Sequence, residues 1–63
     1  MLQIKAIREK RGMTAAELAR KVKTTPVSIS RYETGKRKPT ITKAAEIAAA
    51  LGVTIDELIG KAG

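Results

Sequence analysis

The sequence predicts a compact all-α domain built from five short helices. Apolar residues recur three and four positions apart through most of the 63 residues, which is the spacing of one face of a helix. Most of these stretches begin after a threonine and stop at a glycine, and these residue types cap the two ends of helices. The length suits one domain over residues 1–63, with a core that is only just large enough to stabilise a fold.

The first helix is predicted over residues 2–11. On it Ile4 and Ile7 face inward, and Gly12 follows at the point where a helix would stop. Arg8 lies one turn beyond Ile4, so it is expected at the edge of the buried face.

Two further helix starts stand close together in the chain. Thr14 and Glu17 form a capping box, in which each side chain bonds the backbone N–H of the other residue. Thr25 followed by Pro26 is a second start, because threonine caps a helix and proline is tolerated at its first position. These signals predict helices over residues 15–22 and 26–33.

The connection between these two helices consists of Lys23 and Thr24 alone. So short a turn makes the helices cross closely, and Ala19 is small enough to permit the approach. The stretch is therefore a predicted helix-turn-helix.

The last two helices are also marked by their caps. Thr40 and Gly52 bound the fourth, and a second capping box, made by Thr54 and Glu57, opens a fifth over residues 55–59. The apolar face of the fourth helix is formed by Ala44, Ile47, Ala48 and Leu51, and that of the fifth by Ile55, Leu58 and Ile59.

The positive charge is concentrated in the half of the chain that carries the helix-turn-helix. Residues 1–38 hold eleven Lys and Arg against three Glu, a balance of +8, whereas residues 39–63 have a balance of −1. A basic half of this kind indicates a polyanionic partner, nucleic acid first. The alternative is a charged surface that only keeps a small protein in solution.

Several functional classes are disfavoured by composition. The chain has neither cysteine nor histidine, so no disulfide, thiolate zinc site or histidine base is available, and we expect no metal, no cofactor and no enzymatic activity. No apolar run reaches the roughly 20 residues of a membrane span. The sharp helix stops also argue against a peptide that lies on membranes. A cytoplasmic protein is expected.

The chain resembles the lambda-repressor-like, Cro/C1-type helix-turn-helix family. Residues that match the family pattern stand in order at the family spacing: Ile4–Arg8, Met13–Val22, Ser28–Glu33, Gly35–Pro39 and Ile47–Leu58. The departures fall in the helix-turn-helix itself. Lys23 and Thr24 replace a turn glycine and a hydrophobic residue, and Ala15 and Pro26 stand where glutamine is frequent.

The resemblance implies a five-helix domain that binds double-stranded DNA, most readily as a transcriptional repressor. It places the helix over 26–33 in the major groove, with Pro26, Val27, Ser28 and Arg31 as base readers. For Arg31 a phosphate contact is an equal alternative, and Ser28 could also bind phosphate or be solvated. The expected phosphate-binding residues are Thr14, Thr25, Ser30, Lys36, Arg37 and Lys38.

The resemblance also implies an ion pair between Arg8 and Glu33, and binding of two copies to DNA half-sites. We expect a weak homodimer, formed on DNA through the C-terminal segment, where Ile55, Leu58 and Ile59 follow a region with little charge repulsion. Some of these three residues must also fill the core of the domain. A protein-interaction or antitoxin-type module, with weak or non-specific DNA binding, is the alternative function. It is kept open because Pro26 and Val27 replace polar base readers.

Overall fold

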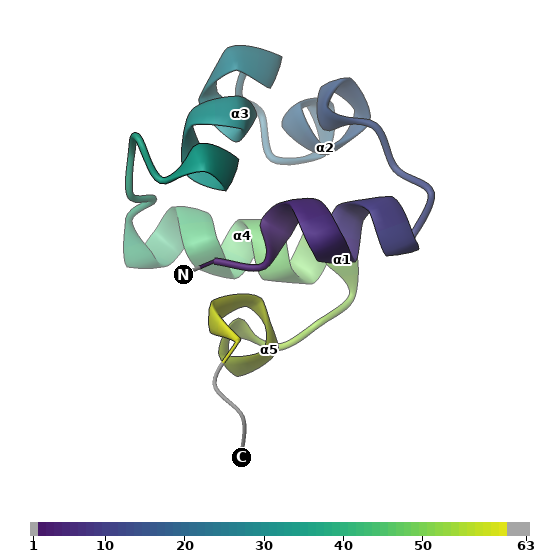
Figure 1. Cartoon of the computed structure of the whole chain (residues 1–63), viewed down its shortest axis with the longest axis vertical. Helices are drawn as coiled ribbons and strands as arrows, with labels where there is room; N and C mark the ends of the chain where they lie inside the picture. The colour runs from purple at the N-terminus through teal and green to yellow at the C-terminus, as the bar shows by residue number, and fades with distance from the viewer. Residues whose placement is uncertain (1, 61–63) are drawn as a thin grey trace.

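The computed structural model describes residues 2–60, and five α-helices make up its regular structure. Figure 1 shows α2 and α3 at one end of the long axis, α1 and α4 across the middle, and α5 at the other end. The expected all-α architecture is confirmed. None of the helices in residues 2–60 combines the length and apolar character needed to cross a membrane. The helices are α1 Ile4–Lys10, α2 Ala15–Lys21, α3 Pro26–Thr34, α4 Ile41–Leu51 and α5 Ile55–Ile59.

The helices after α1 begin as the threonines predict. Each threonine side chain accepts a hydrogen bond from the backbone N–H three residues further along, which satisfies one of the free donors at a helix start. Both predicted capping boxes are present. The four capping residues are Thr14, Thr25, Thr40 and Thr54.

The first helix is shorter than the predicted 2–11. It begins at Ile4, and Gln3 before it has a non-helical backbone, with φ −98° and ψ 28°. The backbone N–H of Gln3 donates to the carbonyl of Leu58 at 2.7 Å. This bond joins the start of the chain to α5. Ile4 is fully buried as expected, whereas Ile7 is only half-buried against the core.

The core is aliphatic and draws on every helix. Its largest fully buried side chains are contributed one per helix, and burial of each stabilises the fold by about 1.5–3 kcal/mol. Tyr32, the single aromatic residue of the sequence, completes this core at 6% exposure. Ala19 is 1% exposed, where its small side chain lets α2 and α3 approach. The five fully buried residues are Ile4, Leu18, Ile29, Ile47 and Leu58.

Candidate nucleic-acid interface

The turn between α2 and α3 contains a strained residue. Lys23 has a φ of 55°, the left-handed conformation that favours glycine, and it is the one non-glycine residue of the described chain with positive φ. Holding a lysine there costs on the order of 1 kcal/mol. The next residue, Thr24, donates its backbone N–H to the carbonyl of Ala19 at 2.8 Å, which closes the turn.

A second contact holds this turn from outside. Lys43, on α4, donates from Nζ to the carbonyl of Val22 at 3.0 Å and to Glu46 Oε1 at 3.0 Å. The bond satisfies a carbonyl at the end of α2, where helix carbonyls lack partners. The sequence did not predict this contact, since it joins residues 21 positions apart and no local pattern indicates it.

One face of α3 is directed away from the core. Ile29 and Tyr32 are buried, whereas Val27 is 59% exposed and Arg31 is also exposed. Val27 and Arg31 are four residues apart, so they lie one above the other on the helix. Flanking them, Pro26 and Ser30 are exposed and Ser28 is half-buried. An apolar residue and a cation therefore share the outer surface of the helix.

The two helix starts of the motif differ in their electrostatics. At α2, the Glu17 carboxylate accepts from the backbone N–H of Thr14 at 3.0 Å, and this bond lowers the pKa of Glu17 below its usual value. At α3, the Thr25 hydroxyl accepts from the backbone N–H of Ser28 at 3.1 Å and donates to the Ser28 hydroxyl at 3.1 Å. The first turn of α3 contains no acidic residue. The start of α3 is thus the more favourable of the two for an anion.

A basic loop, Lys36, Arg37 and Lys38, follows α3, and all three residues are exposed. The loop turns back on the helix, because the backbone N–H of Arg37 donates to the carbonyl of Arg31 at 3.2 Å. The guanidinium carbon of Arg37 lies 5.9 Å from the centre of the Tyr32 ring. The sequence did not predict this contact between Arg37, an expected phosphate-binding residue, and Tyr32, an expected core residue.

The structure brings Arg8 and Glu33 together across α1 and α3. Arg8 Nε lies 2.7 Å from Glu33 Oε2, and the two side chains are only 12% and 8% exposed. Arg8 also donates to the carbonyl of Met13 at 2.9 Å. The hydrogen bond to Glu33 raises the pKa of Arg8, so the guanidinium is firmly charged.

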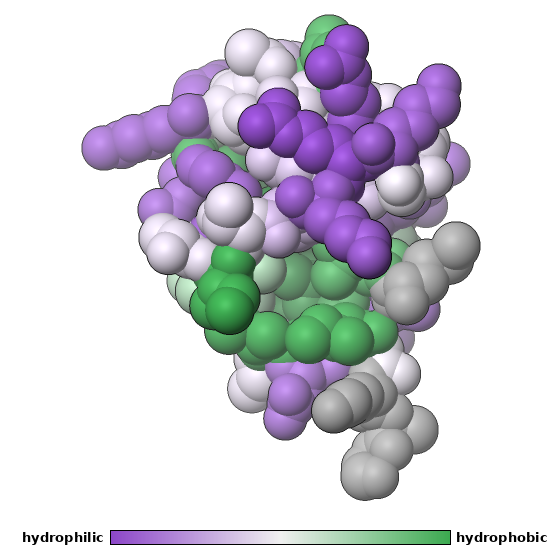
Figure 2. Space-filling model, turned by 90° about the vertical axis from the view of Figure 1, so that its left-hand side faces the viewer, coloured by the Kyte–Doolittle hydropathy of each residue, from purple (hydrophilic) through white to green (hydrophobic). Residues whose placement is uncertain are grey.

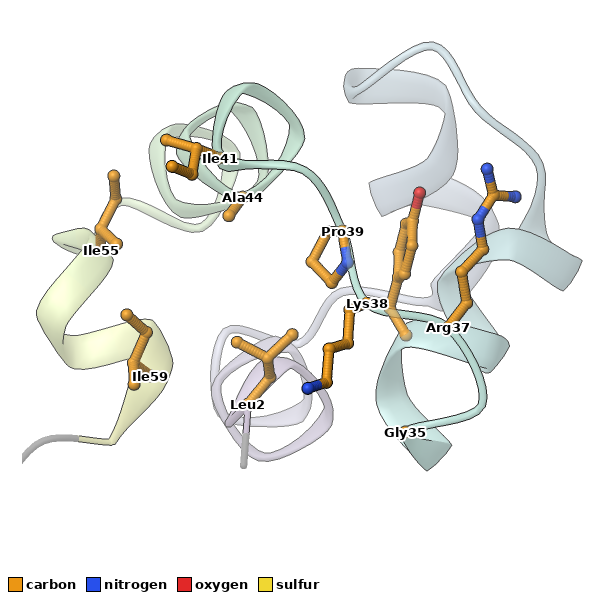
Figure 3. A pocket seen from close by; sticks show the side chains of 10 residues that line it. Leu2, Gly35, Arg37, Lys38, Pro39, Ile41, Ala44, Ile55 and Ile59 are labelled. Carbon is orange, nitrogen blue, oxygen red and sulfur yellow. The ribbon is translucent and has the colours of Figure 1, made fainter.

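An apolar groove lies beside the basic loop. Figure 2 shows a hydrophobic belt below the hydrophilic upper surface, and Figure 3 shows side chains from α4, from α5 and from Leu2 around the groove. The groove has a volume of about 380 Å³. Ile41 is 85% exposed at its edge, and Ile55 and Ile59 are also exposed. Leu58, in contrast, is fully buried in the core and is unavailable to a partner. The apolar residues that line the groove are Leu2, Pro39, Ile41, Ala44, Ile55 and Ile59.

Over residues 2–60, three or more acidic side chains do not gather at any point where a metal ion could be held.

Comparisons with known proteins agree with this geometry. The sequence model of the Cro/C1-type helix-turn-helix family matches residues 4–58. Among the solved structures, the chain is similar to the P22 c2 repressor protein crystallised in complex with synthetic operator 9T, with 28% identity and a TM-score of 0.84. That match covers 90% of this chain and 86% of the repressor chain. A search of curated protein sequences found no match. The chain belongs to the Cro/C1-type helix-turn-helix family of DNA-binding transcription regulators.

Proposed function

We propose that this protein is a sequence-specific repressor that occupies an operator in double-stranded DNA, with α3 in the major groove. The observation that carries the proposal is the outer face of α3, where Val27 and Arg31 are exposed with no partner in the core to explain them. A helix of this kind fits the major groove and presents its first residues to the base edges. Repression is then steric and needs neither cofactor nor catalytic residue.

The base readers have different chemistry. Arg31 can donate to both acceptors of a guanine, which is worth about 1–3 kcal/mol of discrimination. Val27 and Pro26 cannot donate, so their contribution is apolar contact with a thymine methyl group. Ser28 is a weaker reader, since its hydroxyl already accepts from Thr25 at 3.1 Å. The P22 c2 repressor, crystallised with its synthetic operator, supports this use of the fold.

Phosphate contacts give affinity and orientation. We assign them to Thr25 and Ser30 on α3 and to the basic loop, each of whose cations would displace counterions from DNA. Thr14 is the weakest member of this group, because the Glu17 carboxylate sits at the same helix end and repels an anion.

The proposed repressor binds DNA as a pair of copies. A single α3 touches few base pairs, whereas two copies on half-sites about 34 Å apart define a longer site. The groove is the proposed contact, with the exposed Ile41 of each copy seated in the groove of the other.

The pairing is weak without DNA. A standard interface buries about 800 Å² per partner, roughly a fifth of the 4367 Å² surface of this molecule. The groove occupies only one side of the molecule, so we expect monomers in solution at micromolar concentration and cooperative pairing on a palindromic site.

Selection of bound sites from a pool of random DNA tests the function. We expect an enriched palindrome with guanine or thymine at positions that respond to changes of Arg31 and Val27. Binding that falls with salt but enriches no site would reject the proposal and favour the protein-interaction module. An acidic polymer in place of DNA serves as the control for simple charge attraction.

Substitution of Ile41 tests the pairing. Ile41→Ser should remove cooperativity on two half-sites and leave affinity for one half-site unchanged, because Ile41 is too exposed to support the core. Ala49→Ser, at an exposed residue of the same helix outside the groove, is the matched control. Unchanged cooperativity in Ile41→Ser would refute the groove as the contact.

A further inference from the structure

The basic loop contains three cations, and Arg37 differs from the other two in its contacts with α3. The backbone N–H of Arg37 is bonded to the last turn of α3 through the Arg31 carbonyl at 3.2 Å, and its guanidinium lies 5.9 Å from the Tyr32 ring centre. No such contact is present for Lys36 or Lys38 among the described residues. In Figure 3 the Arg37 side chain extends in the opposite direction from that of Lys38, away from Leu2.

The ring that holds Arg37 is itself fixed. Tyr32 is 6% exposed and packs in the core with residues of the other helices, so it cannot follow a mobile side chain. A guanidinium within about 6 Å of a ring centre is attracted to the face of the ring. The guanidinium keeps all five of its N–H donors in this contact, because attraction to a ring uses none of them.

We infer that Tyr32 is a positioning residue, an inference that rests on the proposed DNA binding. Tyr32 raises the affinity for DNA because it holds Arg37 in place for contact with a phosphate. A free arginine loses side-chain entropy when it binds, and one that is already held loses less. Tyr32 thus affects DNA binding through Arg37 and does not itself contact the DNA. The basic loop then divides into one ordered phosphate clamp and two flexible cations.

The experiment is a double-mutant cycle on DNA binding, measured at several salt concentrations. Tyr32→Leu removes the ring and keeps an apolar core residue, and Tyr32→Phe keeps the ring. Since a contact of this kind is worth about two- to fivefold in an equilibrium constant, Tyr32→Leu should weaken DNA binding by that factor and Tyr32→Phe should not. Circular dichroism at the assay temperature must show each variant folded, and assays at lower temperature extend the comparison if Tyr32→Leu melts early.

The salt dependence separates positioning from charge. Arg37→Ala should flatten the plot of log affinity against log salt by about 0.9, whereas Tyr32→Leu should leave the slope unchanged because the cation remains. In the Arg37→Ala background, Tyr32→Leu should have no further effect on affinity. In the Lys36→Ala background it should keep its full effect, which makes Lys36 the matched control.

Three results would overturn the inference. Equal effects of Tyr32→Leu with and without Arg37 would show a purely structural role for the ring. Stronger DNA binding by Tyr32→Leu would show that the ring withholds Arg37 from DNA. A normal affinity in folded Tyr32→Leu would show that the contact has no consequence. Failure of the proposed function itself looks different, since the parent protein would then enrich no site from random DNA, whatever effect Tyr32→Leu has on affinity.

Discussion

Removal of Glu33 is the perturbation whose effect follows most directly from the structure. Glu33→Ala would leave the Arg8 guanidinium charged, only 12% exposed, and bonded to the Met13 carbonyl alone. Breaking a buried pair in this way costs about 3–5 kcal/mol. The remaining bond to Met13 and the partial exposure place the expected loss at the lower end, about 3 kcal/mol. A domain of 63 residues has a total stability of about 3–9 kcal/mol, so Glu33→Ala brings it close to unfolding.

Urea unfolding followed by circular dichroism measures this loss, and the chain supplies its own control. Lys43 and Glu46 form a second ion pair, at 3.0 Å, but Glu46 is 48% exposed, so Glu46→Ala should cost no more than about 1 kcal/mol. Replacing both members of the buried pair, as Arg8→Met with Glu33→Leu, should recover most of the loss because no charge is left alone. A loss in Glu33→Ala no larger than that in Glu46→Ala would refute the reasoning.

Three further predictions follow from the site. Replacement of Lys36, Arg37 and Lys38 by alanine should weaken binding to all DNA sequences alike and flatten the salt dependence by about 2.7, as titrations at several salt concentrations would show. Lys23→Gly should raise the free energy of unfolding by roughly 0.5–1 kcal/mol, since it removes the strain of the left-handed backbone. Lys23→Ala keeps this strain and should not raise the free energy of unfolding. A clearly lower free energy of unfolding in Lys23→Gly would contradict the prediction. The lowered pKa of Glu17 means that its capping bond stabilises the fold above the ordinary carboxyl value of 4.5 and is lost as the pH falls through the folded value. The free energy of unfolding, measured with urea, should therefore fall less in Glu17→Gln than in the parent when the pH is lowered from neutral to below 4.5. An equal fall in both proteins would contradict this.

The fold was largely predictable because local signals decide the helix ends. Four threonine caps and the helical spacing of apolar residues mark the helices, and the structure confirms them to within two residues. The start of α1 was predicted too early, and no local pattern predicts the bond from Gln3 to Leu58, which joins this start to α5. The contact of Lys43 with Val22 was missed for the same reason.

The candidate site was predictable by residue type but not by arrangement. Charge and family resemblance point to Arg37 as one of three equivalent cations, and only the path of the loop places it against Tyr32. Spacing likewise predicts an apolar face for α5, but the structure is needed to show that Leu58 enters the core while Ile59 remains at the surface. Ile41 lies outside the apolar face of the helical pattern, and its exposure next to the groove is the basis for the contact proposed for it.

The charge of the protein gives a reason why the proposed pairing would depend on DNA binding. Each copy carries +7, so two copies that meet in free solution have a total charge of +14 and repel each other. In the proposed complex, DNA phosphates would neutralise the cations of the basic loop, which borders the groove through Arg37 and Lys38, and so relieve that repulsion. Neighbouring half-sites also hold two copies at an effective concentration in the millimolar range. Under those conditions tenfold cooperativity needs about 1.4 kcal/mol from the contact, and burial of one isoleucine, about 1.5–3 kcal/mol, is enough to supply it.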